Sequence, residues 1–276
     1  MEYGSERYIT INKMNIRYAM RGSGRPLLLL HGFCEFLETW DFNLRPLGEH
    51  YQVYAIDLPG HGLSDKPYLD YDIAFFTDFT LSFMNALGID RASIIGHSFG
   101  GAIGISTATG FPERVERLIL ESSFGLGSDI SLLHKLCSVP VLAKPGSQGA
   151  RTALEERMSL EFYKPDFVAQ EIVGRSYLFM QMPEARRVML NIMHNWVDAQ
   201  GLRREAIMMD RLHLIQAPTL VIHCTQDRIH PLRLSRNAWR LIPNARIRIL
   251  SGCGHCPHIE KAAEFNEAVI EFLGTD

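Results

Sequence analysis

Residues 96–100 form the pentapeptide Gly-His-Ser-Phe-Gly, which restricts the possible folds more than any other feature of the chain. It lies between a predicted strand at residues 91–95 and a predicted helix at residues 99–109. That helix consists almost wholly of small and apolar residues and therefore has to be buried. A sharp strand-to-helix turn would project the hydroxyl of Ser98 into a site, and glycine is required on both sides because larger side chains would collide. The pentapeptide predicts a serine nucleophile on an α/β core.

The remaining sequence alternates strand-like and helix-like patterns, as in a mostly parallel sheet with helices on its faces. An apolar run at residues 26–30 is typical of a strand buried on both faces. An antiparallel pair at residues 8–13 and 15–20 is expected to precede it. Further strands are predicted at residues 51–56, 91–95, 117–121, 219–223 and 245–250, and helices at residues 72–87, 99–109, 232–242 and up to residue 273.

The pattern changes between residues 123 and 208, where strand signals vanish, methionines gather and prolines interrupt helical segments. We interpret this stretch as a helical cap inserted into an α/β core made of residues 1–122 and 209–276. Open α/β sheets bind ligands at the carboxyl edge of their strands. A cap over that edge would therefore cover the expected binding site.

The composition excludes several kinds of partner. With 28 Lys and Arg against 31 Asp and Glu, the net charge is −3, so no basic excess favours nucleic acid or an anionic membrane. No secretory signal and no apolar stretch of membrane length is recognised. Five cysteines, an odd number, do not suggest a disulfide framework, so a reducing, cytoplasmic location is expected. A monomer and a homodimer both stay open.

Four motifs follow one another in the order found in the α/β-hydrolase superfamily, and the chain resembles that family over residues 8–122 and 210–274. The motifs are His31-Gly32-Phe33, residues 57–67 (Asp-Leu-Pro-Gly-His-Gly-Leu-Ser-Asp-Lys-Pro), residues 96–101 and Gly254-His255. The resemblance implies an α/β-hydrolase fold, with a mostly parallel eight-stranded sheet and a helical cap. It also implies a catalytic triad in the chain order serine, acid, histidine.

Carried over to this sequence, the resemblance implies a triad of Ser98, Asp227 and His255. Asp227 follows the predicted strand at residues 219–223, and His255 follows the last strand. The acid has to fix the histidine tautomer and stabilise the imidazolium that forms during catalysis. Other candidates stay open, namely Glu121 and Asp57 as the acid and His258 as the base.

The backbone N–H groups of Phe33 and Phe99 are expected to bind the oxyanion. Phe33 follows a buried strand, and Phe99 opens a helix whose positive end faces the reacting centre. His97, Trp196 and Phe162 are expected to line a substrate pocket, since such pockets are mostly apolar and aromatic. Acyl transfer by these groups needs no organic cofactor and no metal.

Residues 253–256, Cys-Gly-His-Cys, are identical to the redox motif of protein disulfide isomerases. We interpret this match as coincidence, because only residues 257–276 follow, whereas the redox fold requires two further strands. Oxidation of Cys253 and Cys256 to a disulfide would strain the loop that carries His255. No spacing of histidine and cysteine matches a zinc ligand set well.

The sequence therefore predicts a serine hydrolase that cleaves carboxylic esters or lactones of small to medium, largely apolar substrates through an acyl-enzyme. A carbon–carbon bond hydrolase of ring-cleavage diketones is the alternative. Relatives of that kind commonly carry asparagine where this chain has His97, which counts against it. A ligand receptor that kept the fold without the activity is a third hypothesis.

Overall fold

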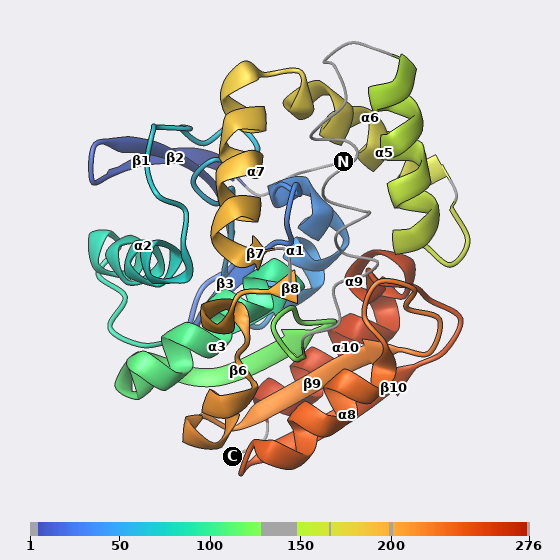
Figure 1. Cartoon of the computed structure of the whole chain (residues 1–276). Helices are drawn as coiled ribbons and strands as arrows, with labels where there is room; N and C mark the ends of the chain where they lie inside the picture. The colour runs from blue at the N-terminus through green and yellow to red at the C-terminus, as the bar shows by residue number, and fades with distance from the viewer. Residues whose placement is uncertain (1–4, 128–147, 166, 199–200, 275–276) are drawn as a thin grey trace.

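The computed structural model describes residues 5–127, 148–165, 167–198 and 201–274 (Figure 1). Its central element is an eight-stranded sheet with the order β1-β2-β4-β3-β5-β6-β9-β10. β2 runs antiparallel to both of its neighbours, and all other pairs are parallel, so the predicted mostly parallel sheet is confirmed. The strands are β1 (Ser5–Ile11), β2 (Met14–Arg21), β3 (Pro26–Leu30), β4 (Gln52–Ile56), β5 (Ala92–His97), β6 (Val115–Glu121), β9 (Thr219–Cys224) and β10 (Ala245–Leu250).

Helices cover both faces of this sheet. They are α1 (Asp41–Gly48), α2 (Ile73–Ala86), α3 (Phe99–Gly110), α8 (Leu232–Leu241), α9 (Pro257–Glu260) and α10 (Ala262–Gly274). Side chains of α2, α3 and α8 share one apolar core with the sheet, and those of α1 and α10 share a second. In β3, Leu28 and Leu30 belong to the first core and Leu27 and Leu29 to the second. This alternation explains why the strand is a continuous apolar run.

Among the described residues, three further α-helices lie between β6 and β9 in the sequence and are here called the cap helices: α5 (Gln148–Glu161), α6 (Phe167–Met180) and α7 (Pro183–Trp196). Figure 1 shows them grouped at the top of the view. Arg157 of α5 donates to the carbonyl oxygen of Phe33 after β3 at 2.8 Å, and Asn191 of α7 accepts the N–H of Tyr71, which follows β4, at 2.9 Å. The cap helices therefore contact loops at the carboxyl edge of the sheet.

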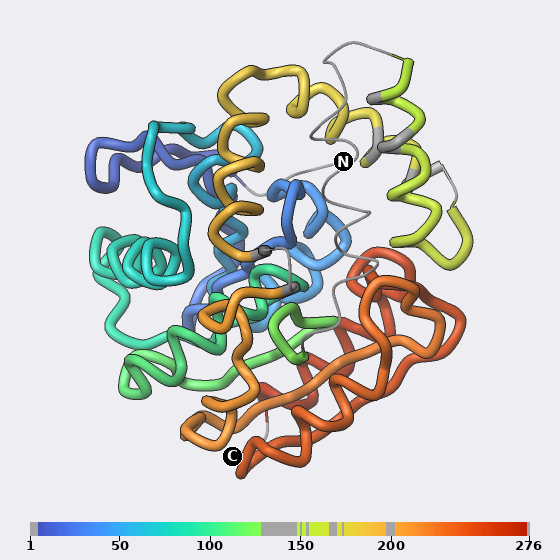
Figure 2. The backbone as a smooth tube through the Cα atoms, viewed as in Figure 1, coloured from blue at the N-terminus to red at the C-terminus, as the bar shows by residue number. Residues whose placement is uncertain are grey.

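The structure adds one feature to the predicted helical cap. A short antiparallel pair, β7 (Val197–Asp198) and β8 (Gly201–Leu202), follows α7 and was not expected from the sequence. Residues 128–147 of the predicted cap lie outside the described residues. In Figure 2, the red C-terminal segment lies below α5, and the two are joined by a hydrogen bond of 2.6 Å between the N–H of His255 and the carbonyl oxygen of Glu161.

The packing of α3 against β3 generates a first prediction. A Cβ at Gly100 would lie 2.1 Å from the carbonyl oxygen of Leu30, whereas a Cβ at Gly110 of the same helix meets no atom within 4 Å. We expect Gly100→Ala to lower the free energy of unfolding by about 2–4 kcal/mol, because the backbone has to shift. Gly110→Ala, the matched control, should change it by less than about 1 kcal/mol. Urea unfolding followed by circular dichroism measures both, and equal effects would contradict the close approach.

Candidate active site

Ser98 occupies a strained turn between β5 and α3. Its φ of 48° lies in the left-handed region, and the residue is 8% exposed. A Cβ at Gly96 would lie 2.3 Å from the carbonyl oxygen of Gly100, so glycine is required where the sequence predicted it. Strain of this kind persists only where the surrounding structure holds it in place, and it is concentrated at functional sites. The turn has the strand–turn–helix geometry expected for a serine nucleophile.

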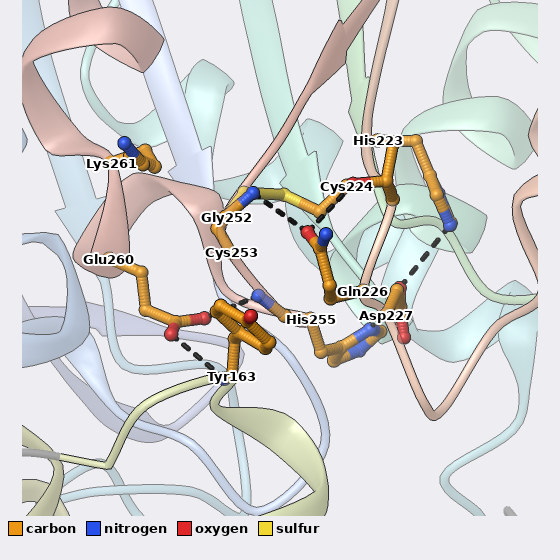
Figure 3. The surroundings of a disulfide bond; sticks show 12 residues. Tyr163, His223, Cys224, Gln226, Asp227, Gly252, Cys253, His255, Glu260 and Lys261 are labelled. Carbon is orange, nitrogen blue, oxygen red and sulfur yellow. Dashed lines mark hydrogen bonds and ion pairs between the residues drawn. A yellow bond between two sulfur atoms is a disulfide. The ribbon is translucent and has the colours of Figure 1, made fainter.

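Asp227 and His255 come from the loops after β9 and β10 and meet through one hydrogen bond (Figure 3). Nδ1 of His255 lies 2.9 Å from Oδ2 of Asp227, and both side chains are buried. Burial alone would raise the pKa of Asp227, but the neighbouring His255 outweighs it and holds the pKa well below its usual range. The carboxylate is therefore ionised. It binds Nδ1 of the imidazole, so Nε2 stays available to accept a proton.

His255 lies beside the turn that carries Ser98. Its ring centroid is 4.8 Å from that of His97, the residue before Ser98, and 5.0 Å from that of His230. The Ser98 hydroxyl makes no hydrogen bond to any residue that the structure describes. In unliganded enzymes such contacts are often long and tighten when the substrate binds. The structure thus joins the predicted acid to the predicted base and brings the base next to the nucleophile turn.

Phe33 and Phe99 belong to two segments that meet beside Ser98, since a Cβ at Gly100 would lie 2.1 Å from the carbonyl oxygen of Leu30 and 2.9 Å from that of His31. Phe33 follows β3, Phe99 is the first residue of α3, and the two rings lie 6.2 Å apart. Within the described ranges, neither N–H donates to a protein acceptor. Two unpaired N–H groups beside a serine are suited to bind a developing oxyanion.

The two alternative acids bind elsewhere. Oε1 of Glu121 lies 2.7 Å from Nδ1 of His258, so the alternative acid and the alternative base are paired with each other. Asp57 forms an ion pair with Arg17 at 3.2 Å. Of the three candidate carboxylates, Asp227 is therefore the one that contacts the predicted base.

The predicted pocket residues have different surroundings. Trp196 packs 4.6 Å from the ring of Phe99 and therefore lies close to the nucleophile turn. Phe162 packs against Met158 and Cys256 in a small separate cluster. His97 is fully buried, with Nε2 3.2 Å from Oε1 of Glu35. A substrate pocket lined by these three residues stays a prediction.

Two residues near the site were missed by the sequence analysis. Phe124 donates its N–H to the carbonyl oxygen of Ser98 at 2.9 Å, and its ring lies 5.3 Å from that of Trp196. The ring of His230 packs edge-on against His255. Each follows the end of a parallel strand by a few residues, and this position at the carboxyl edge is the signal that could have identified them.

The first cap helix is hydrogen-bonded to the loop that carries His255. The carbonyl oxygen of Glu161, at the end of α5, accepts the N–H of His255 at 2.6 Å. The carboxylate of Glu260 accepts the N–H groups of Tyr163 at 2.8 Å and Gly254 at 2.6 Å (Figure 3). A Cβ at Gly254 would lie 2.4 Å from the carbonyl oxygen of Glu161, so only glycine allows this approach.

A disulfide joins Cys224 to Cys253 (Figure 3), which corrects two expectations from the sequence. The odd number of cysteines did not suggest a disulfide, and the expected partner of Cys253 in any oxidised form was Cys256. Cys256 is instead a buried free thiol, and burial raises its pKa well above the usual value. The bond connects the last residue of β9 to the loop that follows the neighbouring strand β10. It therefore links the two loops that carry the predicted acid and base.

Comparisons with known proteins agree with this fold. A model described as "Alpha/beta hydrolase family" matches residues 27–268. An uncharacterized protein of Mycobacterium tuberculosis is 30% identical over 98% of this chain and 81% of its own length. A solved meta-cleavage product hydrolase from Pseudomonas fluorescens is 26% identical, with a TM-score of 0.84 and coverage of 99% of this chain and 98% of its own. A solved enzyme that degrades N-acyl homoserine lactones is also 26% identical, with a TM-score of 0.77 and coverage of 96% and 100%.

The disulfide generates a second prediction. We expect the double variant Cys224→Ala, Cys253→Ala to lose about 2–4 kcal/mol of unfolding free energy, because the bond restricts the unfolded chain. Reduction of the wild-type protein with a phosphine should have a similar effect. The double variant is the control, since the reductant should leave its stability unchanged. Full wild-type stability after complete reduction, verified by thiol counting, would contradict the prediction.

Proposed function

Since the chain belongs to the alpha/beta hydrolase family, we propose that it is a serine hydrolase that cleaves carboxylic ester or lactone bonds through an acyl-enzyme at Ser98. One observation carries the proposal: a buried acid–base pair, Asp227 and His255, packed beside a strained serine turn. A carboxylate that binds Nδ1 of an imidazole leaves Nε2 as a suitable base for a serine hydroxyl.

In the proposed reaction, Nε2 of His255 takes the proton of Ser98 while the oxygen attacks the carbonyl carbon. The amides of Phe33 and Phe99 bind the oxygen on which negative charge develops. The imidazolium, stabilised by Asp227, then gives its proton to the leaving alcohol. Water repeats the same steps and releases the carboxylic acid. These residues perform both half-reactions themselves, and the proposal assigns no step to a cofactor or a metal.

The surroundings of Ser98 support a small to medium, largely apolar substrate. The rings of Phe33, Phe99 and Trp196 pack together beside the turn, and apolar walls of this kind are typical of small-molecule sites. The likeness to a lactone-degrading enzyme supports a cyclic ester as one substrate class. A small molecule is the proposed partner, without nucleic acid or membrane, and the chain acts as a monomer or a homodimer.

Carbon–carbon bond hydrolysis is the second candidate. The observation that favours it is the likeness to a meta-cleavage product hydrolase over almost the whole of both chains. Against it stands His97, at a position where such relatives commonly have asparagine. A vinylogous diketone assay run beside a nitrophenyl ester series separates the two candidates. A ligand receptor would turn over neither substrate.

The location of the protein is also part of the proposal. No helix among the described residues is long and apolar enough to cross a bilayer. The sequence favours the cytoplasm, whereas the disulfide between Cys224 and Cys253 favours an oxidising compartment, because cytosolic thiols are mostly kept reduced. Trapping thiols in whole cells before lysis distinguishes the two: reduced Cys224 and Cys253 support the cytoplasm, and a bonded pair argues against it.

The nucleophile generates a third prediction. Ser98→Ala should lower turnover of a nitrophenyl ester by about four to six powers of ten, because alanine lacks the hydroxyl that would form the acyl-enzyme. Asp227→Asn should lower kcat by about 10⁴, since the imidazole tautomer is then wrong. Steady-state kinetics measure both variants.

Labelling with a fluorophosphonate provides the direct control. The wild-type protein should acquire one adduct, at residue 98, whereas Ser98→Ala should acquire none. Near-normal turnover by Ser98→Ala, or an adduct at another residue, would exclude covalent catalysis by this serine.

A further inference from the structure

Four titratable side chains form a continuous buried chain behind the Ser98 turn: Glu35, His97, Glu121 and His258. Oε1 of Glu35 lies 3.2 Å from Nε2 of His97, and Oε2 of Glu121 lies 3.7 Å from Nδ1 of the same ring. Oε1 of Glu121 lies 2.7 Å from Nδ1 of His258. All four residues are buried, the most exposed being Glu35 at 7%. Carboxylates and imidazoles alternate along the chain, so each buried carboxylate faces at least one imidazole.

One end of the buried chain, Glu35, contacts the turn at residues 31–33, here called the oxyanion turn because it carries Phe33. The other oxygen of Glu35, Oε2, accepts the N–H of Gly32 at 2.7 Å, and the N–H of Glu35 donates to the carbonyl oxygen of Gly32 at 3.2 Å. A Cβ at Gly32 would lie 2.8 Å from the Glu35 carboxyl group, which shows how closely the carboxylate packs against this peptide. The next peptide N–H belongs to Phe33, a proposed oxyanion donor. The direction of that N–H therefore depends on where Glu35 holds Gly32.

The middle of the buried chain includes His97, the residue before the proposed nucleophile Ser98. The ring of His97 packs against those of His255 and His258, with centroids 4.8 and 4.7 Å away. Burial alone would lower the pKa of His97, but Glu35 and Glu121 outweigh it and raise the pKa to about 9. Burial would likewise raise the pKa of Glu35, yet His97 holds it well below its usual range. The two groups are thus an ion pair at neutral pH.

At the other end of the buried chain, His258 pairs with Glu121. Glu121 is the last residue of β6. Its carboxylate accepts the backbone N–H of His258 at 3.0 Å, which fixes the start of α9 just after the loop of His255. Its own carbonyl oxygen accepts the N–H of Ser98 at 2.9 Å. The buried chain therefore contacts the oxyanion turn, the nucleophile turn and the segment after the base.

We propose that Glu35 is a positioning residue of the reaction: by bonding Gly32 N–H and pairing with His97, it fixes the oxyanion turn relative to the Ser98 turn. This inference rests on the proposed acyl transfer. Glu35 touches no reacting atom and acts through the peptide between Gly32 and Phe33. Misplacement of a catalytic group by about 1 Å can cost a hundredfold in rate, so a carboxylate that sets this spacing affects turnover rather than binding.

The same side chains could also serve as metal ligands. The ligand atoms of His97, Glu121 and His258 lie within 4.8 Å of one another, as do those of Glu35, His97 and Cys256. The alternation of carboxylate and imidazole already balances the charges without a cation. The metal content of the purified protein therefore belongs among the tests.

The experiment compares Glu35→Met, Glu35→Gln and a matched control, Glu38→Met. Methionine keeps the size of the side chain but accepts no strong hydrogen bond, whereas glutamine retains an oxygen for the N–H of Gly32. The side chain of Glu38, three residues further on, is only 9% exposed and is also ion-paired, but its partners are Arg17 and Arg175. Glu38→Met therefore removes a carboxylate from the same segment without touching the buried chain.

We expect Glu35→Met to lower kcat for a nitrophenyl ester about 10- to 100-fold with KM unchanged within about twofold. The rate of fluorophosphonate labelling of Ser98 should fall in parallel, because the phosphoryl oxygen of the reagent would bind the same two backbone N–H groups. Glu35→Gln should recover a large part of the loss, and Glu38→Met should keep kcat within about twofold. Glu35→Asp, which keeps the charge but cannot span both partners, replaces Glu35→Met if the latter does not fold.

Equal losses of kcat in Glu35→Met and Glu38→Met would overturn the inference, as would a change confined to KM or an undiminished kcat. The inference would also be overturned if the purified protein held one equivalent of zinc that Glu35→Met and His258→Ala both lose. The buried side chains would then form a metal site. A wild-type protein that hydrolyses no ester and is not labelled at Ser98 would instead refute the proposed function. The two failures are therefore distinguishable.

Discussion

The structure depends on the contact between the start of α3 and the strands β3 and β5. At Gly96 and Gly100 the backbones approach so closely that a single added carbon would collide with a carbonyl oxygen. This approach forces Ser98 into a left-handed conformation and directs the helix toward the end of β3. The first residue of the helix and the residues that follow β3 are consequently close to one another. The arrangement of these segments follows from backbone packing before any polar side chain contributes.

Much of the fold could be predicted because the spacing of hydrophobic residues and the composition of a segment are both visible in a short stretch of sequence. The continuous apolar run of β3 divides its leucines between two cores, and the small residues of α3 match a helix enclosed between a sheet and α2. The short pair β7–β8 escaped prediction because two-residue strands carry no period. Within the site, the predicted acid and base, Asp227 and His255, share a hydrogen bond because both follow neighbouring parallel strands.

Other features could not be predicted because they depend on contacts between distant segments. Cys224 and Cys253 are 29 residues apart, and only the parallel register of β9 and β10 brings them together. His97 was expected in a pocket, and the structure shows it fully buried and paired with Glu35. Its partner Glu35 lies in a loop whose sequence has no periodic pattern, and no local signal pairs the two.

The hydrogen bond between α5 and the backbone of His255 has a consequence for the proposed hydrolase. His255 donates its backbone N–H to the last carbonyl of that helix, and Glu260 bonds both the base loop and the segment after the helix end. An outward displacement of α5 would break these bonds and free the backbone of the loop that carries His255. In the proposed hydrolase, the position of α5 would therefore govern the alignment of the base.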